Sequence, residues 1–99
     1  MKVNLEKCFR DAGMGVIVFT MRFCPYCVRA KDLLTRRGVS FQEVLVEEDD
    51  DSAWVDLERR SGMKTMPQIF FGGELIGGYS ELAKIDAVDR LTKLKPQPA

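Results

Sequence analysis

The sequence predicts one α/β domain, built on a four-stranded mixed sheet with helices on both faces. Two strand-like runs, 16–20 and 41–46, are separated by a helical segment, a pattern typical of neighbouring parallel strands. Two further runs, 68–71 and 74–77, flank a Gly-Gly pair that suits a two-residue hairpin turn. The chain has 99 residues, so residues 1–99 are expected to form a single domain.

The first two elements follow from local signals. Leu5, Cys8 and Phe9 have helical spacing, and Gly13 ends that segment. The next run, residues 16–20, is short, apolar and β-branched, as expected of a central parallel strand that is buried on both faces.

A second helix is expected from Pro25 to about Arg37. Proline favours the first helical position, and Gly38 fits the C-terminal cap. The apolar side chains of this helix that are expected to face the core are Val28, Leu33 and Leu34.

The second half of the chain is expected to hold two helices around the hairpin. Strand 41–46 leads to a helix over 52–61, which Gly62 ends. Ser80 is expected to be the N-cap of the last helix, and residues 95–99 are expected to form a frayed tail. The periodic apolar positions of the last helix are Leu82, Ile85, Val88 and Leu91. A β-α-β half followed by a β-β-α half resembles the thioredoxin-type layout.

Composition argues against several classes of function. Lys plus Arg and Asp plus Glu each number 15, and this balance argues against nucleic-acid binding driven by phosphate neutralisation. No apolar stretch approaches the length of a membrane span, so no membrane partner is expected. Residues 1–7 carry charges where a signal peptide needs an apolar core, which predicts a cytoplasmic location. The absence of histidine excludes Cys-His catalysis and His-ligated zinc.

The segment Cys24-Pro25-Tyr26-Cys27 closely follows the first strand and opens a helix. Thiolate is the attacking form of cysteine, and an ordinary thiol, with a pKa of roughly 8.5, is mostly protonated in the cytoplasm. If Cys24 caps the helix, unpaired backbone amides and the positive end of the helix dipole favour its thiolate. Cys27 lies one turn further on and is expected to be more buried. We therefore expect Cys24 to be the nucleophile and Cys27 the resolving thiol.

Two other interpretations of the cysteine pair are weaker. The pair is either inert and buried, or half of a zinc site. A zinc site needs further ligands at suitable spacing, and only Cys8 remains, a lone residue on an expected helix. A Cys-x-x-Cys after a strand in a βαβ pattern is instead typical of redox proteins. We therefore expect redox chemistry, no metal site, and a packing role for Cys8.

Three later features remain open from local sequence. Pro67, in Thr65-Met66-Pro67, is either a simple strand-initiating proline or a cis proline. The turn over residues 77–80 either binds a carboxylate at the N-terminus of the last helix or is a Gly-rich turn with a serine cap. Trp54 is either a core anchor or exposed near the active-site face.

Together these residues resemble the glutaredoxin family, from about Gly15 to Leu94. Three motifs in the same order carry the resemblance: Cys24-Pro25-Tyr26-Cys27, Thr65-Met66-Pro67-Gln68-Ile69-Phe70 and Ile76-Gly77-Gly78-Tyr79-Ser80. The resemblance implies a thioredoxin-like fold and a glutathione-dependent oxidoreductase that reduces protein disulfides and glutathione mixed disulfides. It further implies a monomer with glutathione as co-substrate, no tightly bound cofactor, and disulfide-containing or glutathionylated proteins as partners.

The resemblance also implies a glutathione groove. Tyr26 and Thr65 would line it, and Pro67 would be cis and lie beside the active site. The backbone of Met66 would pair with the cysteinyl unit of glutathione. The residues implied to hold the γ-glutamyl carboxylate at the N-terminus of the last helix are Gly78, Tyr79 and Ser80.

The chain departs from the family where the glycyl carboxylate of glutathione is held. Many glutaredoxins have a lysine three residues before the nucleophile, where this chain has Met21, and Arg or Gln where Trp54 aligns. Arg22 or Lys64 is the candidate replacement, and we assign Arg22 to the expected glutathione site. Weaker glutathione binding or a shifted preference toward protein disulfides would follow if neither replaces the family contacts.

Three alternative functions fit the sequence less well. A glutathione-ligated iron–sulfur carrier usually has Gly or Ser after its first cysteine, and Pro25 argues against it. A redoxin reduced by thioredoxin reductase differs in its usual motif. A module that only binds is disfavoured by the intact cysteine pair.

Overall fold

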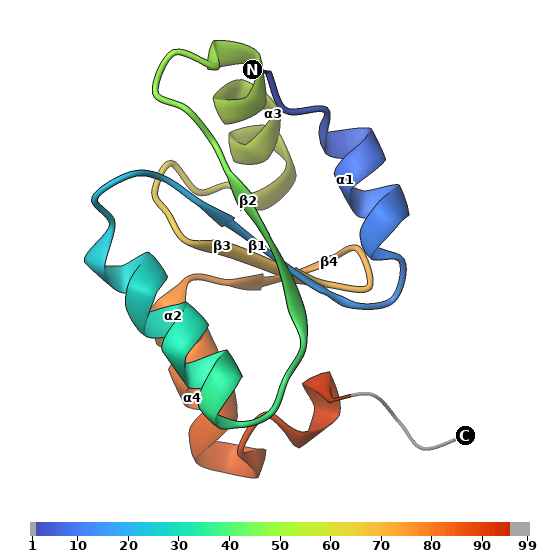
Figure 1. Ribbon diagram of the computed structural model, residues 1–99, viewed down its shortest axis with the longest axis vertical. Helices are drawn as coiled ribbons and strands as arrows, with labels where there is room; N and C mark the ends of the chain where they lie inside the picture. Colours follow the sequence, from blue (N-terminus) through green and yellow to red (C-terminus); the bar gives the residue numbers. More distant parts are fainter. Residues whose placement is uncertain (1, 96–99) are drawn as a thin grey trace.

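The computed structural model describes residues 2–95, and these form one four-stranded sheet flanked by helices (Figure 1). The elements are α1 (Leu5–Ala12), β1 (Val16–Thr20), α2 (Pro25–Arg36), β2 (Phe41–Leu45), α3 (Asp51–Ser61), β3 (Gln68–Phe71), β4 (Glu74–Gly77), α4 (Tyr79–Asp89) and a short 3-10 helix η1 (Thr92–Leu94). The order of elements agrees with the prediction, and η1 is the one addition.

The sheet is mixed, as the sequence predicts. Its strand order is β2-β1-β3-β4, with β1 parallel to β2 and antiparallel to β3, and β4 antiparallel to β3. All five residues of β1 are buried, because this strand has neighbours on both edges and helices on both faces. The apolar, β-branched run of β1 is what such a position requires.

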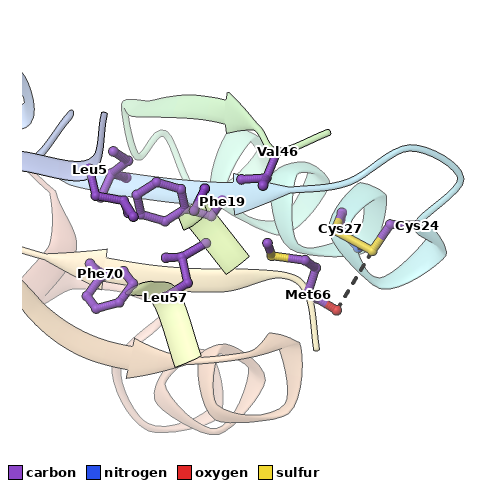
Figure 2. Packing of buried hydrophobic residues seen from close by; sticks show 10 residues of the cluster. Leu5, Phe19, Cys24, Cys27, Val46, Leu57, Met66 and Phe70 are labelled. Carbon is purple, nitrogen blue, oxygen red and sulfur yellow. Dashed lines mark hydrogen bonds between the residues drawn. A yellow bond between two sulfur atoms is a disulfide. The ribbon is translucent and has the colours of Figure 1, made fainter. Parts of the chain in front are cut away.

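Two apolar clusters lie on opposite faces of the sheet. Figure 1 places α1 and α3 on one face, and α2 and α4 side by side on the other. Because side chains alternate along a strand, Ile17 and Phe19 of β1 pack with the first helix pair, and Val16 and Val18 with the second. Figure 2 shows the first cluster, in which the rings of Phe19 and Phe70 meet edge to face at 5.8 Å.

The cysteine pair belongs to the cluster on the α1 and α3 face. Cys24 is 7% exposed and Cys27 is 2% exposed, and Figure 2 shows both beyond Val46 and Met66 at one end of this core. The redox pair is therefore supported by the packed interior.

One expected core position of α2 is wrong. Val28 is 54% exposed, whereas the buried residues of the helix are Cys27, Ala30, Leu33 and Leu34. Residues three and four apart share a helix face, and Val28 lies one position off the face that Cys27 and Ala30 define. Val28 was placed inside on hydrophobicity alone, although the buried position expected for its neighbour Cys27 points to a different face of the helix.

The ends of α4 also differ from the prediction. Gly78, not Ser80, is the N-cap, and the helix ends at Asp89. Val88 is 87% exposed. Leu91 is buried as expected, but its φ of 61° places it in the left-handed turn that leads to η1, outside the regular helix.

Two negative findings apply to residues 2–95. No helix there is long and apolar enough to cross a membrane. The same residues contain no cluster of three or more Cys, Asp or Glu side chains placed to hold a metal ion. The frayed tail expected over 95–99 falls, apart from Lys95, outside the described residues.

Candidate active site

Cys24 lies where β1 gives way to α2. It is the N-cap of α2, with extended backbone angles (φ −114°, ψ 97°), and Pro25 occupies the first turn. The backbone N–H of Cys27 donates to Cys24 Sγ at 3.1 Å. Cys24 and Cys27 are joined in a disulfide. The structure therefore has the helix-capping cysteine that the motif predicted.

The two cysteines have different surroundings. Both cysteines are buried, and Cys27 is the more deeply buried of the two. Once the disulfide is reduced, the Cys27 N–H and the helix N-terminus both favour a negative charge on Cys24 Sγ. Cys27 has no matching position at the helix start, which suits a second, resolving thiol.

The loop before β3 comes within contact distance of the pair. The carbonyl oxygen of Met66 lies 3.8 Å from Cys24 Sγ, and Figure 2 draws this contact. The disulfide sulfur has no hydrogen to donate, so this contact becomes a hydrogen bond only when Cys24 is a thiol. The Met66–Pro67 peptide bond is cis, as the resemblance implied.

The side chain of Gln68 holds this loop through hydrogen bonds, a role that the sequence interpretation missed. Its side chain is fully buried, and Nε2 donates to the carbonyl oxygens of Met63 at 3.1 Å and Thr65 at 3.2 Å. These two bonds tie the loop to β3 and thereby fix the backbone that faces Cys24. A glutamine directly after Pro67 in an otherwise apolar strand is the signal that was available.

A surface groove of about 380 Å³ brings most of the expected glutathione residues together. It is lined by Tyr26, Met63, Thr65, Met66, Pro67, Gly78, Tyr79, Ser80 and Glu81. The rings of Tyr26 and Tyr79 lie 6.1 Å apart between centroids, and the Arg29 guanidinium sits 5.3 Å from the Tyr26 ring centroid. Met63 and Glu81 were not predicted.

Glu81 organises the α4 end of the groove. Gly78 N–H donates to Glu81 Oε1 at 2.7 Å, and the Ser80 hydroxyl donates to Oε2 at 2.9 Å. These bonds, the Gly78 one foremost, lower the pKa of Glu81. The bond from Gly78 N–H to Glu81 is one half of a capping box, because a glycine at the N-cap has no side chain to complete the other half.

Arg22 lies outside the lining of the groove. Its Nε and Nη2 donate to the Glu47 carboxylate at 3.0 Å and 2.9 Å. This double hydrogen bond raises the pKa of Arg22 and lowers the pKa of Glu47. Lys64 is exposed and is not part of the lining either. A role for Arg22 or Lys64 in holding glutathione stays a prediction.

Met21 and Trp54, the two departures from the family, both lie against the core. Each is half-buried and packs on the cluster of the α1 and α3 face. Trp54 Nε1 donates to the carbonyl oxygen of Glu47 at 3.0 Å, which fixes the backbone of the residue that holds Arg22. Trp54 is thus a partial core anchor, one of the two alternatives.

The glutaredoxin family model matches residues 16–76, which include the cysteine pair and Pro67. The chain belongs to the glutaredoxin family. It is 43% identical over 73 residues to glutaredoxin 3 of Escherichia coli, covering 74% of this chain and 87% of that protein. It is 38% identical over 79 residues to a glutaredoxin of Pseudomonas aeruginosa, covering 80% and 93%.

Solved structures agree with this assignment. A buckwheat glutaredoxin in complex with glutathione superposes with a TM-score of 0.79 at 28% identity, covering 91% of this chain and 84% of that chain. A glutaredoxin from Brucella melitensis superposes with a TM-score of 0.72 at 36% identity, covering 84% and 89%. The thioredoxin-like fold is confirmed, and the protein is a glutathione-dependent disulfide oxidoreductase.

Proposed function

We propose that the protein reduces protein disulfides and glutathione mixed disulfides through Cys24 as nucleophile and Cys27 as resolving thiol. The observation that carries this assignment is the position of Cys24, which caps α2 and accepts the Cys27 N–H at 3.1 Å. A negative charge is stabilised at that sulfur and not at its partner. Cys24, the more exposed of the two residues, is also the one whose sulfur lies beside the Met66 backbone.

The proposed reaction has two exchanges for a protein disulfide. The Cys24 thiolate attacks one substrate sulfur, a mixed disulfide forms, and the second substrate sulfur leaves as a thiolate. The Cys27 thiolate then attacks Cys24 Sγ, which releases the substrate fully reduced and leaves the Cys24–Cys27 disulfide. Two electrons pass to the substrate, and two glutathione molecules return the pair to the dithiol form as they become glutathione disulfide.

A glutathione mixed disulfide needs only Cys24. Its thiolate takes the glutathionyl group, the substrate leaves as a thiolate, and a second glutathione releases the first as glutathione disulfide. We propose that the groove holds the glutathionyl group, with the Met66 backbone along its cysteinyl unit and Tyr26 and Thr65 beside it. The γ-glutamyl carboxylate is proposed to bind at residues 78–80, where α4 begins, because helix N-termini favour anions.

We further propose that this activity takes place in the cytoplasm, in a monomer with no tightly bound cofactor. The partners proposed are disulfide-containing or glutathionylated proteins, and neither nucleic acid nor a membrane. The zero formal net charge is the argument against nucleic acid. Three cysteines are too few for a secreted disulfide scaffold, which supports the location.

Two variants test the proposed roles. Cys24→Ser is expected to abolish turnover of every disulfide substrate in an assay coupled to glutathione and glutathione reductase. Cys27→Ser is expected to lose reduction of protein disulfides but to keep deglutathionylation. Equal loss of deglutathionylation in both variants would contradict the assignment. If turnover requires thioredoxin reductase in place of glutathione, the glutathione-dependent function itself is wrong.

A further inference from the structure

Phe23, the residue directly before the nucleophile, is almost completely exposed. Its side chain is 97% accessible to solvent. Phe9, Phe19 and Phe70 form a packed ring cluster in the core, whereas no ring pair among the described residues includes Phe23. An aromatic side chain in this state forgoes all the free energy that burial of its apolar surface provides.

The backbone of Phe23 is also in an unfavourable conformation. Its φ is 56°, in the left-handed region that bulky residues rarely adopt. The next residue, Cys24, caps α2, and the side chain of the preceding residue, Arg22, is bonded twice to Glu47. The ring is therefore attached directly before the start of α2. Such local strain beside a reactive group is a reason to look for function.

Val28 is the residue that would usually pack against a side chain at the position of Phe23, but it does not bury the Phe23 ring. Phe23 precedes the N-cap, and Val28 is the fourth residue of α2, the two positions that commonly pack together as a hydrophobic staple. Val28 is 54% exposed, and Phe23 remains 97% exposed. Two apolar side chains thus face solvent next to Cys24.

We propose that Phe23, together with the exposed Val28, is a contact surface for protein disulfide substrates that carry an apolar side chain next to the attacked cysteine. This inference rests on the proposed function, because it needs a polypeptide whose sulfur bonds to Cys24. A polypeptide bonded to Cys24 must lie close to Phe23, because Phe23 is the residue directly before Cys24. Phe23 is not among the residues of the groove proposed for glutathione, so the proposed contact is separate from that groove.

The local charges favour an apolar occupant. Arg22, the cation next to Phe23 in the chain, is already paired with Glu47. An acidic side chain of a substrate would have to compete with that carboxylate, whereas an apolar side chain gains by covering the ring. The side chain next to the substrate cysteine is therefore the one that Phe23 selects.

The test is a single-turnover reaction of the pre-reduced protein with two cyclic disulfide peptides that differ only at the residue next to one cysteine, Leu or Ser. In each, the Cys24–peptide bond forms as the peptide disulfide breaks, and Cys27 then releases the dithiol peptide. The Leu peptide is expected to react about tenfold faster, the effect of partly burying one large apolar side chain. Phe23→Asn, which tolerates the left-handed backbone, is expected to bring the ratio near one.

Matched variants complete the test. Phe23→Tyr keeps the aromatic ring and is expected to keep the ratio of the two rates. Val88→Ser removes an apolar side chain that is 87% exposed on α4, and it is also expected to leave this ratio unchanged. Circular dichroism of Phe23→Asn and of a second variant, Phe23→Gly, checks folding. Equal rates for the two peptides in the unmodified protein, or a ratio that survives both Phe23→Asn and Phe23→Gly, would overturn the inference.

The single-turnover design separates this inference from the proposed function. It uses no glutathione, so a chain that glutathione fails to recycle still reports the ratio. Reduction of neither peptide would refute the dithiol function and the inference together. Reduction of both peptides at the same rate would refute the inference alone.

Discussion

Two regions flank the cysteine pair, and the resemblance assigns one end of glutathione to each. The α4 region, residues 78–81, contributes backbone groups and a capping carboxylate to the groove. The Arg22 region consists of Met21, Arg22, Glu47 and Trp54, and none of these residues lines the groove. The α4 region thus lines the groove, whereas the two charged side chains of the Arg22 region pair with each other outside it.

The difference follows from what each region is made of. Backbone N–H groups at a helix start are placed by the fold, so any sequence that forms the turn and the helix presents them. A side-chain cation binds whichever carboxylate lies within reach, and Arg22 meets Glu47 at 2.9 Å. A site built on main chain is therefore less sensitive to sequence change than one built on a single guanidinium.

The largest expected effect comes from breaking the α4 region at Gly77. Its φ is +130°, and a Cβ there would lie 2.7 Å from Glu81 Cγ. Gly77→Ala is therefore expected to cost about 1–3 kcal/mol for the backbone alone, and more because Glu81 must move away from Gly78. Urea unfolding measures the loss of free energy, and the KM for a glutathionylated peptide is expected to rise.

Gly73→Ala is the matched control for this prediction. Gly73 also has a positive φ, +84°, but a Cβ there would meet nothing within 4 Å. The Gly73→Ala variant therefore measures the cost of the positive φ alone, without a steric clash. Equal loss of stability in the two variants, or an unchanged KM in Gly77→Ala, would contradict the role given to the contact between Gly77 and Glu81.

The same contrast explains how much of the site was predictable. The position of Cys24 at the start of α2 was predictable from the sequence, because turn, cap and helix signals act locally on the main chain. Seven residues of the groove were expected only through the resemblance to glutaredoxins, since local signals left Pro67 and residues 77–80 open. The bond from Arg22 to Glu47 joins residues 25 positions apart. No local pattern specifies which of several acids a long side chain will meet.

The fold was predictable to a similar degree and for similar reasons. Periodicity and glycine signals gave the order of helices and strands. Val28 was misplaced because an apolar residue was assumed to be buried, and Ser80 because its cap preference was considered without Glu81. Both errors concern neighbours within a single helix: Cys27 lies on the buried face of α2 in place of Val28, and the Glu81 carboxylate accepts the Gly78 N–H at the start of α4.

A smaller effect is expected from freeing Arg22. Glu47→Gln removes the charge that holds the guanidinium, so Arg22 becomes available to a substrate carboxylate. The KM for a glutathionylated peptide is expected to fall by less than about fivefold, since exposed ion pairs are weak and screened by salt. Steady-state assays at low and high salt measure the change, which should shrink at high salt.

Glu43→Gln is the control for this prediction, because it breaks a different exposed pair, Lys31–Glu43 at 3.0 Å. Glu43→Gln should leave the KM as it is. A KM that falls in both variants would indicate a general effect of net charge. A KM that rises in Glu47→Gln would mean that Glu47 positions Arg22 for substrate instead of withholding it.

The smallest expected effect separates charge from geometry in the α4 region. Glu81→Gln keeps an oxygen that can accept the Gly78 N–H, removes the charge, and replaces the oxygen that accepts the exposed Ser80 hydroxyl with an amide NH2. Hydrogen bonds in the folded state lower the pKa of Glu81 below its ordinary value of 4.5. The stability that the Glu81 charge contributes is therefore full above that pH and is lost as the pH falls through the folded-state pKa.

At pH 7 the Glu81→Gln variant is expected to be about 0.3–1 kcal/mol less stable than the unmodified protein, the usual range for a charge at a helix N-terminus. Urea unfolding between pH 3 and pH 7 should show this difference constant above about pH 5 and shrinking below it. A difference that is the same at every pH would assign the contribution of Glu81 to hydrogen-bond geometry and not to its charge.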